Sequence, residues 1–178
     1  MVVRMKVNVV AFLWEVRGGL PVQIEQDVVV KGKRRISAHH LIRPGGSSAL
    51  RAVRRNQGRW SGVSSVYQAF WLIAGFLSHN DLDNADAYLR AARPFGNNPR
   101  LLNLEAILAY KRNDLARAST TMEAAVLRDR SAVNLYNLAV IRRASGDTAG
   151  AGAAVDEILR RHPASALVGL AGELTHPE

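Results

Sequence analysis

The feature that most constrains the fold is a turn motif that occurs three times at intervals of 33 residues. Its copies begin at Asn80-Asp81, Asn113-Asp114 and Gly146-Asp147, and an alanine follows each aspartate by four residues. Asn and Gly tolerate the left-handed backbone that ends a helix, and Asp caps the start of the next one. The alanine allows two helices to approach closely. A period of this length predicts stacked helical hairpins.

The segments around each turn support this interpretation. Apolar residues before the turns fall within 66–77, 101–110 and 135–141, and apolar or small residues recur at helical spacing after them. Pro99 and Pro163 close the first and third units. Each unit therefore predicts two helices joined by the turn, with the small-residue helix second.

This pattern resembles the tetratricopeptide repeat (TPR) family over roughly residues 63–165. The third unit matches best, through Tyr136-Asn137-Leu138-Ala139, Gly146-Asp147, Ala151 and Pro163. The resemblance implies an all-α solenoid of three helical hairpins over residues 63–178, in which the first helices line a concave groove. Residues 166–174 are predicted to form a short capping helix, because terminal repeats need a cover.

The chain ahead of the repeats differs in charge. Residues 1–62 hold 12 Lys and Arg against Glu15, Glu25 and Asp27, whereas residues 63–178 hold 12 basic and 12 acidic residues. We expect a β-hairpin within residues 7–30 and a flexible basic arm over 31–59. The arm is either a solvated linker or a site for an anionic partner such as nucleic acid. The cations assigned to that site are Lys31, Lys33, Arg34, Arg35, Arg51, Arg54, Arg55 and Arg59.

The sequence contains no motif for catalysis or cofactor binding. Cysteine is absent, which removes disulfides, thiolate metal sites and cysteine nucleophiles, and no nucleophile elbow, phosphate-binding loop or HExxH motif occurs. His39-His40 lacks further ligands at metal-site spacing. We therefore predict a non-enzymatic protein without cofactor or metal. No transmembrane span is expected, and we predict a cytoplasmic location, with export as the alternative.

The remaining chemistry is binding. A concave TPR-like groove would present aromatic, amide and cationic side chains to a peptide or helix of another protein. The groove residues predicted from helical spacing are Tyr67, Phe70, Trp71, Arg100, Asn103, Tyr110, Lys111, Tyr136, Asn137 and Arg143. We expect a scaffold or adaptor. The alternatives are a chaperone-like accessory of secretion or pilus assembly, and a nucleic-acid-associated protein that uses the basic arm.

Overall fold

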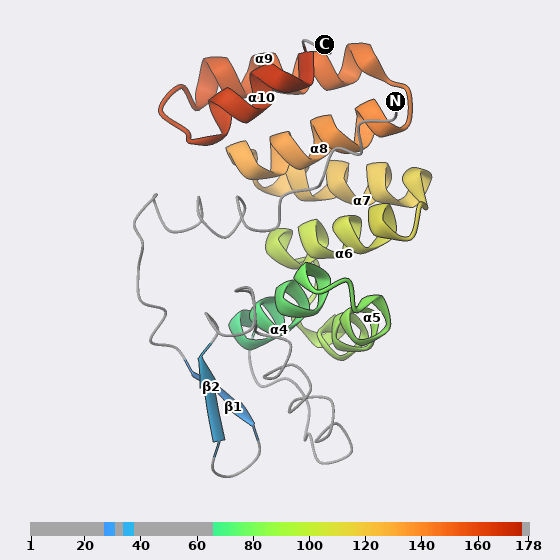
Figure 1. The fold of residues 1–178 in the computed structure, drawn as a ribbon, viewed down its shortest axis with the longest axis vertical. Helices are drawn as coiled ribbons and strands as arrows, with labels where there is room; N and C mark the ends of the chain where they lie inside the picture. The colour runs from blue at the N-terminus through green and yellow to red at the C-terminus, as the bar shows by residue number, and fades with distance from the viewer. Residues whose placement is uncertain (1–26, 31–33, 38–65, 176–178) are drawn as a thin grey trace.

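The structure is a computed structural model, and it describes residues 27–30, 34–37 and 66–175. Within 66–175 it contains seven α-helices and one short 3-10 helix, stacked along the long axis of the molecule (Figure 1). The bounds are α4 Val66–Ser78, α5 Leu82–Ala91, η2 Arg93–Phe95, α6 Pro99–Lys111, α7 Leu115–Arg128, α8 Ala132–Ala144, α9 Thr148–Arg161 and α10 Leu167–Thr175.

The helices form hairpins, as the repeat predicts. The pairs α4–α5, α6–α7 and α8–α9 pack together, and each hairpin contacts the next through α5–α6 and α7–α8. The first helices α4, α6 and α8 also contact one another in order. The last helix, α10, packs on both α8 and α9, where it covers the end of the stack as expected of the capping segment.

The three repeated turns share one backbone conformation. Asn80, Asn113 and Gly146 have φ angles of 57°, 63° and 86°, so each occupies the left-handed region. The following aspartate N–H donates to a carbonyl five residues earlier at 2.9 Å in all three turns, which is the Schellman arrangement. The sequence therefore predicted the helix ends correctly.

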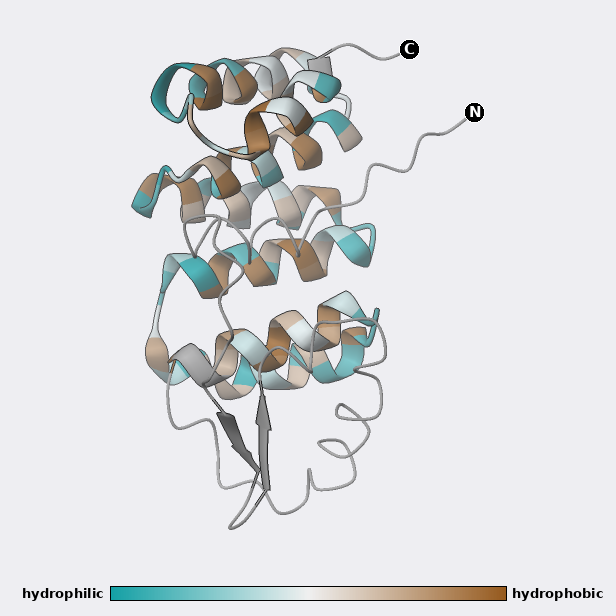
Figure 2. Ribbon diagram, turned by 60° about the vertical axis from the view of Figure 1, so that its left-hand side comes forward, coloured by the Kyte–Doolittle hydropathy of each residue, from teal (hydrophilic) through white to brown (hydrophobic). Residues whose placement is uncertain are grey.

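The alanines after each turn lie at helix contacts. Ala85 and Ala118 are fully buried and Ala151 is nearly so. Large side chains such as Phe76, Leu104 and Ile141 are fully buried in the core, and the ring of Phe76 stacks on Tyr88 within the first hairpin. The second helices α5, α7 and α9 bury residues at helical spacing and expose the rest, whereas α8 is buried over the whole of 132–141; Figure 2 shows the mixed hydropathy along the helices.

The only strands in the described residues form a short antiparallel hairpin. Strand β1 (Asp27–Val30) pairs with β2 (Arg34–Ser37), with Val28 opposite Ile36. The partner of β1 in this hairpin follows it in the chain and lies within the segment predicted as a flexible arm, whereas the hairpin expected within residues 7–30 stays a prediction. A strand pairs most readily with its immediate neighbour across a short connection. Residues 7–26 of the predicted hairpin lie outside the described residues.

Candidate functional site

The predicted groove residues lie on the first helices α4, α6 and α8, which neighbour one another in the stack. We call the surface that these helices share the first-helix face. Its side chains fall into a buried group and an accessible group, and only the second can contact a partner without rearrangement.

The aromatic residues of α4 belong to the buried group. Phe70 and Trp71 are each 2% exposed, and their rings meet edge to face with centroids 5.2 Å apart. Tyr136 on α8 is also buried. These rings therefore belong to the buried core and are not on the accessible surface. The side chain of Tyr67 lies outside the described part of the chain.

The predicted amides are buried as well, and they bind one another. Asn103 Nδ2 donates to Asn134 Oδ1 at 2.6 Å, and Asn137 Nδ2 donates to Asn103 Oδ1 at 3.2 Å. Asn134 in turn donates to the Asp129 carbonyl oxygen at 2.7 Å. This chain of amides joins α6 to α8 across the junction of the second and third hairpins. The roles of Asn103 and Asn137 in this structure are therefore within the stack.

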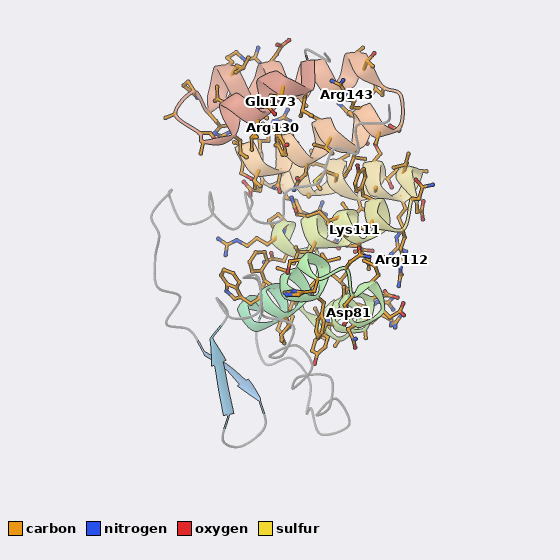
Figure 3. All side chains as sticks on the ribbon, in the orientation of Figure 1. Asp81, Lys111, Arg112, Arg130, Arg143 and Glu173 are labelled. Carbon is orange, nitrogen blue, oxygen red and sulfur yellow. The ribbon has the colours of Figure 1, made fainter. Side chains whose placement is uncertain are left out.

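The accessible group gathers toward the carboxyl ends of α6 and α8. Tyr110 is half-buried, and burial raises the pKa of its hydroxyl. Lys111 ends α6 and reaches the Asn80 Oδ1 of the preceding turn at 3.5 Å. Arg143 has no acidic partner within ion-pair distance among residues 66–175. Figure 3 marks Lys111 and Arg143 near these helix ends.

Arg100 does not belong to this cluster. It is exposed in the first turn of α6, and its backbone N–H donates to Asn98 Oδ1 at 3.0 Å in the helix cap. Eleven residues of helix separate it from Lys111, a distance of about 16 Å along the axis. The structure therefore does not bring it together with Tyr110 and Arg143.

Glu173 of α10 is a charged residue beside the first-helix face that the sequence prediction did not include. Burial is the main cause that raises the pKa of Tyr136, and the Glu173 carboxylate and Tyr110 contribute to it. Glu173 is exposed on α10, which packs against α8, the helix that carries Tyr136. Helix α10 is not part of the 33-residue repeat, so the repeat could not predict that this helix packs against α8.

The basic arm stays a prediction. Arg34 and Arg35 lie in β2, and the other six cations assigned to the arm lie outside the described residues, as do His39 and His40.

The described residues also contain no cluster of three or more His, Cys, Asp or Glu that could hold a metal ion. None of their helices is long and apolar enough to cross a membrane.

Comparison with known proteins adds no identity. No family model, no curated protein and no solved structure matches this chain.

Proposed function

We propose that this chain is a non-enzymatic protein-interaction module of the TPR type, which binds a peptide or helix of a partner protein on its first-helix face. The 33-residue period, the three matching left-handed turns and the buried alanines after them support the TPR assignment. In solenoids of this kind, stacked hairpins create an extended surface that suits binding better than catalysis.

The observation that carries the proposal is the accessible cluster at the ends of α6 and α8. Tyr110 offers an aromatic side chain that is only partly buried. Lys111 follows it at the end of α6, and Arg143 lies in the last turn of α8. An aromatic residue beside cations is a common anchor at protein interfaces. The partner segment should therefore carry an apolar residue that contacts Tyr110 and an acidic residue near Arg143.

The test begins with affinity capture using the full chain, followed by titration calorimetry of the captured partner. Tyr110→Ala should weaken binding by at least about 2 kcal/mol, roughly thirtyfold, because it truncates an anchor at the centre of the contact. Thr120→Ala, an exposed change on the second helix α7, is the control and should leave affinity unchanged. Equal affinities for both variants, with helical circular dichroism retained, would place the binding surface elsewhere.

A further inference from the structure

The helical stack has two edges that differ in charge. All first helices run one way and all second helices (α5, α7, α9) run back, so the connections from second to first helices lie along one edge. His162 after α9 supports this geometry, because its Nε2 lies 2.8 Å from the Arg130 carbonyl oxygen in the preceding connection. We call residues 88–102, 125–135 and 158–170 the arginine edge. They extend from the last turn of each second helix into the first turn of the next helix.

Cations gather strongly on this edge. It contains Asp129 as its single acidic residue, together with seven arginines: Arg90, Arg93, Arg100, Arg128, Arg130, Arg160 and Arg161. The opposite edge, over 75–85, 108–118 and 141–151, has five cations and four aspartates. Residues 63–178 as a whole are balanced in charge. The positive edge therefore arises from how the fold distributes charge and not from composition.

Most of these arginines lack an acidic partner. Arg130 and Arg161 share Glu157, and Arg90 pairs with Asp86. The other four arginines have no carboxylate within 4.0 Å among the described residues, and they are Arg93, Arg100, Arg128 and Arg160. Every connection contributes at least one of them, so unpaired positive charge extends along the whole edge.

The Arg130–Glu157 pair shows how the edge holds a carboxylate. Arg130 Nε and Nη2 donate to the two oxygens of Glu157 at 2.7 and 2.6 Å. This two-point geometry is the one in which a planar guanidinium binds a carboxylate most strongly. An acidic partner residue would find the same chemistry at the unpaired arginines.

A partly open hollow with both apolar and charged lining residues lies beside this edge. It has a volume of about 320 Å³ and lies among α7, α8 and α9, with Val126, Leu135, Leu138 and Ala154 in its lining. Leu127 borders it and is 78% exposed, so its side chain is accessible to a partner at the mouth of the hollow. The Arg130–Glu157 pair stands at one end and the Arg142–Glu123 pair, at 3.0 Å, at the other. The hollow can accept one apolar side chain.

We infer that the arginine edge binds an acidic protein segment that places an apolar side chain in the hollow beside Leu127. Charge complementarity selects the acidic residues, and the hollow selects the apolar anchor. The aromatic rings on this edge are Tyr88, which is buried, and Phe95, which is partly buried, so the edge offers no row of exposed rings on which nucleic-acid bases could stack, and a phosphate backbone would leave the hollow empty. This surface is separate from the Tyr110 cluster, so it adds a contact that the first-helix face does not supply.

The test measures binding of labelled probes to the full chain by fluorescence anisotropy. The probes are a synthetic peptide of repeated Glu-Glu-Leu units, its Glu-Glu-Ser counterpart and a short DNA duplex. The variant Arg128→Gln/Arg160→Gln removes two edge cations that pair with no carboxylate. The control Arg112→Gln/Arg117→Gln removes two cations from the opposite edge, so that both proteins have the same net charge and the same basic arm.

The edge variant should bind the Glu-Glu-Leu peptide roughly tenfold more weakly than the control, because two exposed charge pairs are lost. Leu127→Ser should weaken binding of the Glu-Glu-Leu peptide and leave the Glu-Glu-Ser peptide unaffected. Equal binding by the edge variant and the control would overturn the proposal. Stronger binding of DNA than of peptide, lost in the edge variant, would also overturn it and assign the edge to phosphate. Neither measurement involves Tyr110. A negative result here can therefore be told apart from a negative result for partner binding on the first-helix face.

Discussion

The two junctions between hairpins use opposite chemistry at matching positions. Asn103, Asn134 and Asn137 join the second and third hairpins, and the residues 33 positions earlier are Phe70, Leu101 and Leu104. All six side chains are buried. The same backbone repeat therefore accepts either an apolar contact or a chain of amides at one place in the stack.

Apolar and amide contacts stabilise a junction in different ways. Apolar side chains stabilise the first junction through the area that they remove from water, without strict geometry. The amides stabilise the second junction only when each donor meets its acceptor, so they disfavour a shifted alignment of the hairpins. Asn137 Oδ1 meets no hydrogen-bond partner among the described residues, so this network is incompletely satisfied.

The largest expected effect tests the apolar junction. Phe70→Ala should lower the free energy of unfolding by about 3–5 kcal/mol, because it removes a buried ring and leaves a cavity beside Trp71. Urea titration followed by circular dichroism measures the loss. Phe95→Ala is a useful control, since this ring is only partly buried and should cost less. If both variants lose the same free energy of unfolding, Phe70 does not stabilise the junction more than a partly buried ring does.

The next effect tests the amide junction. Asn103→Leu should cost about 2–4 kcal/mol, because Asn134 loses the donor and Asn137 loses the acceptor that Asn103 provides. Replacing all three asparagines with leucine should recover most of that loss, since no buried polar group then remains unpaired. Urea titration of the single and triple variants separates the two cases. A triple variant that is less stable than the single one would contradict this account.

A smaller effect compares the turns of the first and third hairpins. Asp147 accepts a hydrogen bond from the Gly150 backbone N–H at 2.8 Å, whereas Asp81 accepts from the Asn84 side chain and makes no side-chain bond to the helix start. Asp147→Ala should therefore cost about 1 kcal/mol, and Asp81→Ala should cost less. Thermal unfolding measures both. Equal shifts in Tm would show that capping does not distinguish these turns.

The smallest effect is a dependence on pH that only the second junction should show. The hydrogen bond from Arg130, with the charges of Arg130, Arg161 and Arg160, holds the pKa of Glu157 below its ordinary 4.5. Because this pKa is lower in the folded state, the stabilisation is complete above the ordinary pKa and is lost as pH falls through the folded-state pKa. Matching positions at the first junction are Asn97 and Ala124, which carry no charge.

Glu157→Gln should therefore reduce the loss of stability on acidification below about pH 4.5. Arg130 is about half exposed, so the effect should be modest. Urea titration of the variant and the parent across this pH range measures the difference. Glu105→Gln provides a matched control, because Glu105 also pairs with an arginine but lies within one hairpin. An identical pH dependence of Glu157→Gln and the parent would contradict the linkage.

The local structure of the helical region could be read from the amino-acid sequence. The 33-residue period located the hairpins, and Asn80, Asn113 and Gly146 marked the ends of the first helices, because a left-handed residue and a capping aspartate act within a few positions of each other. Helical spacing also placed Tyr110, Lys111 and Arg143 on first helices.

Only the tertiary structure decided which of these side chains a partner could reach. Helical spacing does not distinguish an asparagine exposed in a groove from one that hydrogen-bonds another asparagine 31 or 34 residues away. The burial of Asn103 and Asn137 could therefore not be predicted from the sequence. The same holds for Glu173, which α10 brings near Tyr136 from outside the repeat, and for the arginine edge. Periodicity reports the face of one helix, whereas burial and charge segregation depend on which helices meet, and that is set by packing between distant segments of the chain.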